Sequence, residues 1–136
     1  MTLREQLVRD EGKRLKPYAD TVGKTTIGVG RNLDDVGISE EEAMFLLDND
    51  IKRTENDVLL RIPWASMLDE VRRAALVNLA FNMGINKLVT FARTLNFIQN
   101  HNYQAAHDEL LHSKYAVQVG DRAKRVAKQI LTGEWQ

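Results

Sequence analysis

The chain has 136 residues, which suits one domain with a hydrophobic core of its own. Its 19 basic and 19 acidic side chains give a net charge of zero, whereas a dedicated nucleic-acid-binding protein usually has a clear basic excess. Cysteine is absent, which excludes disulfides and thiol chemistry. The neutral total conceals a split, because residues 1–68 carry 10 basic and 13 acidic side chains and residues 69–136 carry 9 and 6.

The N-terminal residues are rich in charge and leave no apolar stretch for a signal peptide. The most apolar uncharged run, residues 74–86, is too short to span a bilayer. We therefore expect no targeting signal and no membrane anchor in this chain.

The first predicted element is a helix over residues 3–11. Thr2 and Glu5 have the spacing of a capping box, and Gly12 is typical of a helix end. Glu11 lies in the last turn, on the apolar face of this helix. The apolar neighbours and the negative end of the helix dipole favour the protonated form of its carboxyl. The side chains that form this face are Leu3, Leu7 and Val8.

A β-hairpin is predicted next, over residues 18–30, with a turn at residues 22–23. Alternation along its second strand places Thr26, Gly28 and Gly30 on one face. That face is almost bare of side chains, which is typical of a sheet bend or of a close approach to the backbone.

The rest of the chain is predicted to be helical. Ser39 and Glu42 form a second capping box, which opens a helix that ends before Pro63. A helix over residues 69–83 is apolar nearly all round and is therefore expected at the centre of its core. Three further helices are expected: one ending near residue 100, one around residues 105–111 and one over residues 121–132.

Glu11 and Asp20 are the strongest candidates for chemistry. Glycoside hydrolysis needs one carboxyl group that keeps its proton and one that stays ionised to organise the nucleophile. The position of Glu11 favours the first role, and Asp20 at the polar hairpin favours the second. Thr26, on the bare strand face, is a candidate to hold a water molecule. The alternative is that Glu11 frays into solvent and Asp20 serves only a turn.

Other sequence features predict no cofactor and no metal site. The three histidines, at positions 101, 107 and 112, do not have the spacing of a helical metal pair. Gly28 and Gly30 lack the remaining residues of a nucleotide-binding loop. The last helix is basic, which usually marks a solvated face and can also attract an anionic polymer. Its basic residues are Arg122, Lys124, Arg125 and Lys128.

Three blocks of sequence, in chain order, carry a further indication. They are Asp10-Glu11-Gly12 with Asp20-Thr21 and Thr26-Ile27-Gly28-Val29-Gly30, then Asn78-Leu79-Ala80-Phe81-Asn82-Met83-Gly84, and finally Thr132-Gly133-Glu134-Trp135. In these blocks the chain resembles the phage-type lysozymes, the T-even and lambdoid endolysin family. The resemblance covers essentially the whole chain. The segment between Gly30 and Ser39 has only eight residues, far fewer than in the T-even form.

The resemblance implies a peptidoglycan muramidase that cuts the β-1,4 bond between N-acetylmuramic acid and N-acetylglucosamine. Glu11 is then the general acid, while Asp20 and Thr26 position the attacking water. This is the inverting scheme, in which the carboxyl groups lie roughly 6.5–9.5 Å apart. Residues expected to bind the glycan are Asn32, Phe81, Asn82, Thr94 and Arg122. The roles of Arg31 and Glu109 stay open, and Arg31 and Asp50 form a candidate ion pair.

The fold implied by the resemblance is α+β and lysozyme-like. A small lobe of about residues 12–58 holds the hairpin, and a mostly helical lobe holds residues 1–11 and 59–136. Together they form a single catalytic domain over residues 1–136, with the active-site cleft between the lobes.

The resemblance also implies partners and a place of action. The expected partner is the glycan strand of peptidoglycan, with no nucleic acid, no stable membrane anchor and a monomeric chain. An endolysin of this kind is made in the cytoplasm of the host bacterium and reaches the cell wall through a holin-type pore, for host cell lysis.

Three alternatives remain at this point. A non-catalytic glycan-binding module would bind peptidoglycan without producing new reducing ends. A protein that acts on nucleic acid or membranes through its basic last helix would depend on that helix alone. A lytic transglycosylase would use Glu11 but would leave anhydro-muramic ends.

Overall fold

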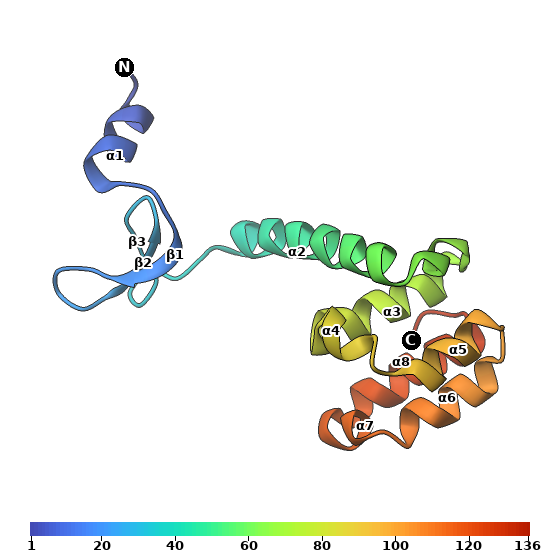
Figure 1. Cartoon of the computed structure of the whole chain (residues 1–136). Helices are drawn as coiled ribbons and strands as arrows, with labels where there is room; N and C mark the ends of the chain where they lie inside the picture. Colours follow the sequence, from blue (N-terminus) through green and yellow to red (C-terminus); the bar gives the residue numbers. More distant parts are fainter. The chain divides into compact units, whose positions relative to one another are not determined.

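The computed structural model describes residues 1–136 and divides the chain into two compact units. Unit 1 is Met1–Leu47 and unit 2 is Asp48–Gln136. Unit 1 contains a short helix, a small sheet and the start of α2, and unit 2 is helical (Figure 1). The fold is therefore α+β, as predicted, while the lobe division expected at residues 12–58 stays a prediction. None of the helices combines the length and apolar character needed to cross a membrane.

The helix α1 (Leu3–Glu11) confirms the first capping box. Thr2 Oγ1 accepts a hydrogen bond from the backbone N–H of Glu5 at 3.1 Å, and the Glu5 carboxylate accepts one from the backbone N–H of Thr2 at 2.8 Å. At the other end, Gly12 has a φ of 77°, which an L side chain rarely adopts, and the helix stops there. Glu11 is therefore the last residue of α1.

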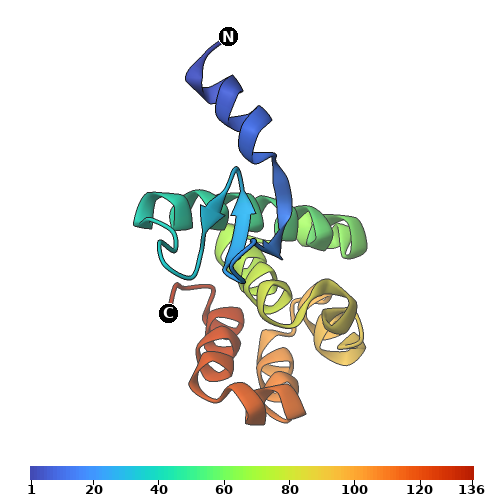
Figure 2. The ribbon, with the colours of Figure 1, turned by 90° about the vertical axis from the view of Figure 1, so that its left-hand side faces the viewer.

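An antiparallel sheet follows in the order β1-β2-β3, and Figure 2 shows its strands side by side. Its strands are β1 (Arg14–Ala19), β2 (Thr25–Gly28) and β3 (Arg31–Asn32). The predicted hairpin is formed by β1 and β2, and Thr26 pairs with Tyr18 on one side and Asn32 on the other. The sequence did not predict β3, because alternation cannot be recognised in two residues. Thr26 thus lies in the central strand and is only 4% exposed.

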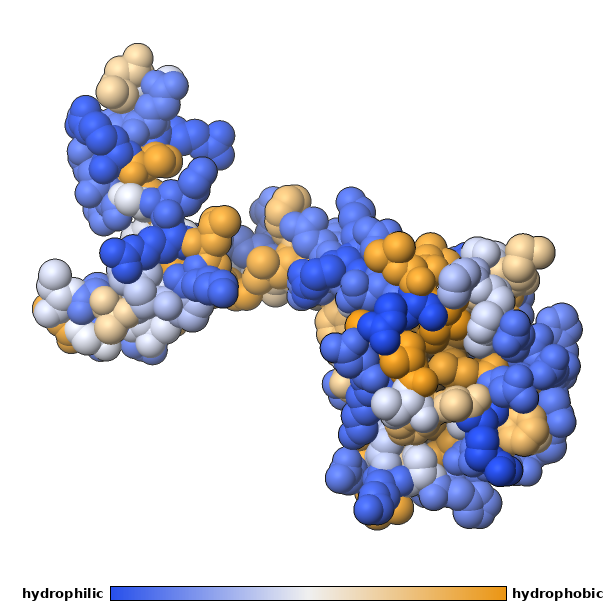
Figure 3. All heavy atoms as spheres, viewed as in Figure 1, coloured by the Kyte–Doolittle hydropathy of each residue, from blue (hydrophilic) through white to orange (hydrophobic).

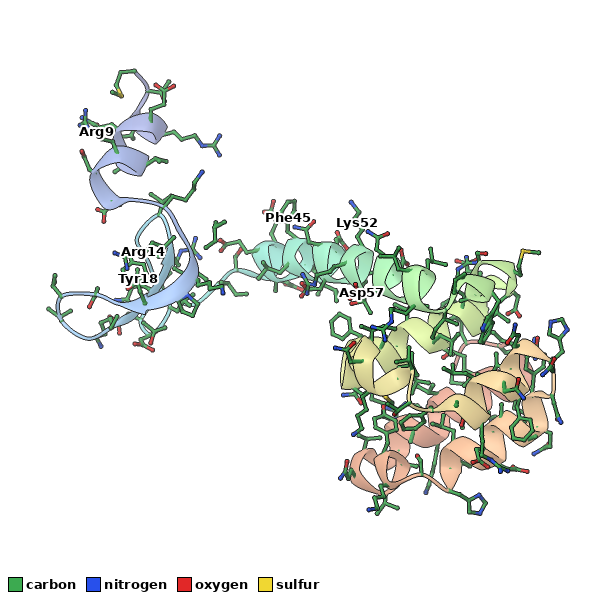
Figure 4. All side chains as sticks on the ribbon, viewed as in Figure 1. Arg9, Arg14, Tyr18, Phe45, Lys52 and Asp57 are labelled. Carbon is green, nitrogen blue, oxygen red and sulfur yellow. The ribbon has the colours of Figure 1, made fainter.

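At the edge of this sheet, β1 pairs irregularly with β2. The register shifts between Arg14 and Tyr18, and Pro17 lies in that stretch. An edge strand tolerates proline because it need not donate a hydrogen bond on its open side. The Arg14 guanidinium lies 4.3 Å from the centre of the Tyr18 ring. Both residues are labelled on β1 in Figure 4.

The long helix α2 (Glu40–Arg61) begins at the second predicted capping box. Ser39 Oγ accepts from the backbone N–H of Glu42 at 3.1 Å, and Glu42 Oε1 accepts from that of Ser39 at 2.9 Å. Arg31 of β3 donates to the same Glu42 oxygen at 2.9 Å. Asp50 pairs with Arg53 at 2.8 Å, and the candidate pairing of Arg31 with Asp50 stays a prediction because the two residues belong to different units. Arg31 and Glu42 join β3 to the start of α2.

The contact between Arg31 and Glu42 predicts an acid-sensitive stability. The hydrogen bonds from Arg31 and Ser39 lower the pKa of Glu42 from 4.5 to about 2. A lowered pKa in the folded state contributes stability that is complete above pH 4.5 and is lost as the pH falls from 4.5 towards 2. The Glu42→Gln variant should therefore show a flatter dependence of its urea midpoint on pH over this window. A matched Glu41→Gln variant removes the charge next to it and should keep the wild-type dependence, whereas equal curves for wild type and Glu42→Gln would contradict the prediction.

Unit 2 is built around α3, as its apolar sequence predicted. Its buried residues include Leu76 and Leu79, and α8 packs against both α3 and α6. Hydrophobic side chains lie in the middle of the visible face of unit 2, with hydrophilic ones around them (Figure 3). The elements after α2 are η1 (Pro63–Met67), α3 (Glu70–Met83), α4 (Ile85–Leu88), α5 (Ala92–Gln99), α6 (Tyr103–Leu111), α7 (Lys114–Val119) and α8 (Asp121–Thr132).

The long helices of unit 2 were predicted and the short ones were not. Asp69 caps α3 by accepting from the backbone N–H of Arg72, and Gly84 ends it, as expected. The elements η1, α4 and α7 are too short for helical periodicity to identify them. A local signal for α7 was nevertheless available, because Ser113 caps it and Gly120 ends it.

Arg72 of α3 fixes the end of α8. Its guanidinium donates to the carbonyl oxygens of Ile130 and Leu131, at 2.7 and 3.0 Å, and lies 3.7 Å from the centre of the Tyr103 ring. The last carbonyl groups of a helix lack partners within the helix, so Arg72 supplies them with donors and favourable charge. A Cβ atom at Gly133 would lie 2.9 Å from this guanidinium, which explains the glycine there.

Candidate active site

Glu11 lies where α1 meets the turn between β2 and β3. Its carboxylate contacts Gly30 so closely that a Cβ atom at that position would lie 2.9 Å from Oε2 of Glu11. Gly30 also has a φ of +71°, a backbone conformation that favours glycine, and a Cβ there would displace the Glu11 carboxylate. The end of α1 therefore approaches the backbone of the sheet at the strand face that the sequence predicted to have few side chains.

The surroundings of Glu11 differ from those predicted. The apolar setting is not provided within unit 1, because α1 has no buried residue and Glu11 itself is exposed. None of the hydrogen bonds and ion pairs of α1 involves the Glu11 carboxylate, and the neighbouring Asp10 pairs with Arg9 at 2.9 Å instead. Within unit 1 the Glu11 carboxylate therefore has no hydrogen-bond or ion-pair partner.

Asp20 is held by the turn that follows β1. Its Oδ1 accepts hydrogen bonds from the backbone N–H groups of Val22, at 3.0 Å, and Lys24, at 2.8 Å. Its own backbone N–H donates to the carbonyl oxygen of Lys24 at 2.9 Å. These bonds fix one carboxylate oxygen and leave Oδ2 without a donor from the protein.

Thr26 is joined to Asp20 through the backbone of Lys24. The Thr26 hydroxyl donates to the Lys24 carbonyl oxygen at 3.0 Å, and the Lys24 N–H donates to Asp20. Because the hydroxyl hydrogen of Thr26 is used in this bond, its oxygen keeps lone pairs that can accept from a water molecule. The Asp20 carboxylate and the Thr26 hydroxyl are thus both hydrogen-bonded to the backbone of Lys24.

Asn32 is the one predicted glycan-binding residue in unit 1. It lies opposite Thr26 in β3. Its amide donates to Asp35 at 2.9 Å, and its side-chain oxygen accepts from the backbone N–H of Asp35 at 3.0 Å. The Asn32 side chain therefore holds the loop that follows β3.

The other predicted glycan-binding residues all lie in unit 2. Phe81 is 44% exposed near the end of α3, and the neighbouring Asn82 accepts a hydrogen bond from the Tyr115 hydroxyl. Arg122 donates twice to the side-chain oxygen of Asn78, at 3.1 and 3.0 Å. Asn82 and Arg122 are therefore each held by a neighbouring helix of the same unit.

Thr94 lines an open pocket of about 310 Å³ in unit 2. Glu109, whose role the sequence left open, lines the same pocket. The Glu109 carboxylate pairs with Arg93 at 3.1 Å, which links α5 to α6 beside the pocket. Sequence reasoning did not identify Arg93, because a single exposed arginine on a short helix carries no motif.

Two residues near Asp20 were also missed. Asp34 and Asp35 follow β3. Asp34 accepts a hydrogen bond from the backbone N–H of Thr25, and Asp35 pairs with the ammonium group of Lys24. The only local signal was a pair of acidic residues directly after a strand, which is typical of many turns.

The chain is similar to known proteins of one family. The family model described as Phage lysozyme matches residues 8–130. The chain is 28% identical to "Probable T4-type lysozyme 1" of Dictyostelium discoideum over 97% of its own length and 95% of that protein. It is 36% identical to "Endolysin" of Salmonella phage P22 over 78% of its own length and 76% of that protein. It is 30% identical to "Pre-baseplate central spike protein Gp5" of Enterobacteria phage T4, over 98% of its own length but 28% of that protein.

Proposed function

The chain belongs to the phage lysozyme family and is a lysozyme-type glycosidase, and from this premise we propose that it hydrolyses the β-1,4 bond between N-acetylmuramic acid and N-acetylglucosamine in peptidoglycan. The observation that carries the proposal is the shared backbone segment of Asp20 and Thr26. A carboxylate with one oxygen fixed and an acceptor hydroxyl, both bonded to the backbone of Lys24, suit the positioning of a water molecule.

Glu11 acts as the general acid. Its proton passes to the glycosidic oxygen while the bond from that oxygen to the anomeric carbon breaks. The Glu11 carboxylate lies beside the backbone of Gly30 and forms no hydrogen bond or ion pair within unit 1, which supports this role.

Asp20 and Thr26 act on the attacking water from the opposite face of the sugar. One hydrogen of the water is donated to Oδ2 of Asp20 and the other to the hydroxyl oxygen of Thr26, so a lone pair is directed at the anomeric carbon. Asp20 takes the proton as the new bond between carbon and oxygen forms. Water then attacks directly and the configuration inverts, which requires carboxyl groups roughly 6.5–9.5 Å apart.

The glycan-binding residues of unit 2 complete the proposal. We propose that Phe81, Asn82, Thr94 and Arg122 contact the sugar rings and their substituents, together with Asn32 of unit 1. Exposed Phe81 offers an apolar surface, and the side chains of Asn82 and Arg122 are oriented in advance by their partners. Ordering these side chains before binding lowers the entropy lost when the glycan binds.

Analysis of the products tests the reaction. We expect purified peptidoglycan to yield reducing muramic acid ends whose first-formed anomer, observed by NMR, is α, because inversion of a β bond gives an α product. Mass spectrometry should show that each cut adds one water. A first-formed β anomer would contradict the inverting scheme, and anhydro-muramic ends would identify a lytic transglycosylase instead.

We also propose that the chain is a monomeric endolysin. In this proposal it is made in the cytoplasm of the host bacterium, is released through a holin-type pore and lyses the host from within. The similarity to the endolysin of phage P22 supports this role. The match to part of a phage T4 spike protein makes incorporation into the virion the second candidate. Mass spectrometry of purified phage particles separates the two, because an endolysin is absent from them.

A further inference from the structure

We propose that the loop of residues 33–38 positions Asp20 and Thr26, and that Asp34 and Asp35 are its positioning residues. The inference rests on the proposed function of Asp20 and Thr26 in holding the water. Neither aspartate touches the substrate in this role, since Asp34 acts through the backbone N–H of Thr25 and Asp35 through the side chain of Lys24.

The backbone of Lys24 is hydrogen-bonded to both Asp20 and Thr26. Its N–H group donates to Asp20, and its carbonyl oxygen accepts from both the backbone of Asp20 and the hydroxyl of Thr26. A shift of this one residue would therefore displace the carboxylate and the hydroxyl together. The geometry of the water site depends on how firmly Lys24 is held.

The loop holds Lys24 and the adjoining Thr25 at three points. Asp34 Oδ2 accepts from the backbone N–H of Thr25 at 2.7 Å, and the backbone N–H of Leu33 donates to the carbonyl oxygen of Thr25 at 2.8 Å. Asp35 pairs with the Lys24 ammonium group at 3.2 Å. The bond to Asp34 is the shortest of these contacts and has an ionised acceptor, so it is the strongest.

The loop is itself fixed at both ends. At its start, Asn32 exchanges two hydrogen bonds with Asp35. Near its end, Arg31 donates to the carbonyl oxygen of Gly37 at 3.0 Å and to Glu42 of α2 at 2.9 Å. With only eight residues between Gly30 and Ser39, the short loop turns back to the sheet within two residues of β3.

The expected effect follows from the sensitivity of catalysis to position. A misplacement of about 1 Å costs on the order of 100-fold in rate. Without Asp34, the N–H of Thr25 bonds to mobile water and the turn at Lys24 loosens. We therefore expect Asp34→Ala to lower kcat by about 10–100-fold and to leave KM within about twofold, because binding of the distant sugar rings is unchanged.

The experiment compares three variants on purified peptidoglycan and measures release of reducing ends. Asp34→Asn keeps an oxygen that accepts from Thr25 and should recover most of kcat. Glu41→Ala removes the same charge from an exposed position of the same unit and should leave kcat and KM unchanged. Hydrogen exchange by NMR should be faster at the amides of Val22 and Lys24 in Asp34→Ala, by about tenfold, and not in Asp34→Asn.

A wild-type kcat in Asp34→Ala overturns the inference. So does a low kcat in that variant with unchanged amide exchange. Equal losses of kcat in Asp34→Ala and Asp34→Asn also overturn it. If Asp34→Ala does not fold, Lys24→Met removes the contact with Asp35 without altering the backbone. A lower kcat with faster amide exchange at residue 24 then supports the inference, and an unchanged kcat overturns it.

Asp20→Asn is assayed in parallel. Full activity of Asp20→Asn would refute the proposed function, whereas an inactive Asp20→Asn beside a fully active Asp34→Ala would refute only the role of the loop.

Discussion

Glu11→Gln is expected to lower the rate of peptidoglycan hydrolysis by at least about 10²–10⁴-fold, the contribution typical of a general acid. The amide has nearly the shape of the carboxyl but has no proton to give to the glycosidic oxygen. Because Glu11 makes no hydrogen bond or ion pair within its helix, folding should not depend on it. The measurement is the release of reducing ends at saturating substrate, with circular dichroism to show that the fold is intact.

Asp10→Asn is the matched control for this variant. Asp10 is the preceding residue, is also exposed and pairs with Arg9, so its substitution removes the same charge from the same helix turn. We expect Asp10→Asn to hydrolyse peptidoglycan at close to the wild-type rate. Near-wild-type hydrolysis by Glu11→Gln would mean that another group protonates the leaving oxygen, whereas equal losses in both variants would indicate an effect of net charge.

The second large effect is expected for Asp20→Asn, which should lower kcat by about 10²–10⁴-fold. The side-chain oxygen of asparagine still accepts from the N–H groups of Val22 and Lys24, so the turn is kept. What is lost is the negative oxygen that takes the proton of the water. The assay is again release of reducing ends, with kcat and KM determined separately.

Asp20→Ala separates the turn from the chemistry. Asp20→Ala removes both the proposed base and the oxygen that accepts the hydrogen bonds of the turn. The backbone amides of Val22 and Lys24 should therefore exchange faster in Asp20→Ala than in Asp20→Asn. Both variants should be nearly inactive, but Asp20→Asn alone should keep wild-type amide exchange. If Asp20→Asn retained most of its activity, a different group would have to organise the water.

Several features could be predicted because they depend on residues close together in the sequence. The capping boxes at Thr2 and Ser39 give the starts of α1 and α2, since each bond joins residues three positions apart. Gly12 and Gly84 give the ends of α1 and α3 for an equally local reason. The short elements β3, α4 and α7 were not predicted because each has too few residues for a repeating pattern to be recognised.

The partners of charged residues could not be predicted in the same way. Arg31 is close to several acids in the sequence, and spacing does not distinguish Glu42 from Asp50. The structure pairs Arg31 with Glu42, because Arg31 of β3 reaches the start of α2 and Glu42 is already held there by its capping box. The contacts of Arg72 with Ile130 and of Arg93 with Glu109 could not be predicted either, since each pair is separated by more than ten residues in the chain.

For the candidate catalytic residues, the sequence predicted some features and not others. The residues alone predicted that Glu11 ends a helix and that Asp20 sits at a hairpin turn. The resemblance to phage-type lysozymes added their roles. The apolar surroundings expected for Glu11 followed from helical periodicity, which reports which side chains share a face but not what covers that face.

The sequence by itself determined the helix ends, the hairpin, the family and the candidate residues Glu11, Asp20 and Thr26, because caps, alternation and motif spacing are all local. Only the tertiary structure decided that the carboxylate of Glu11 rests on Gly30 and that Asp20 and Thr26 share the backbone of Lys24. It alone showed that Asp34 binds the backbone N–H of Thr25 and that Asp35 binds the Lys24 ammonium group, both from a separate loop. Contacts of this kind depend on strand register and on how a loop returns to the sheet, and neither is encoded in the spacing of a few residues.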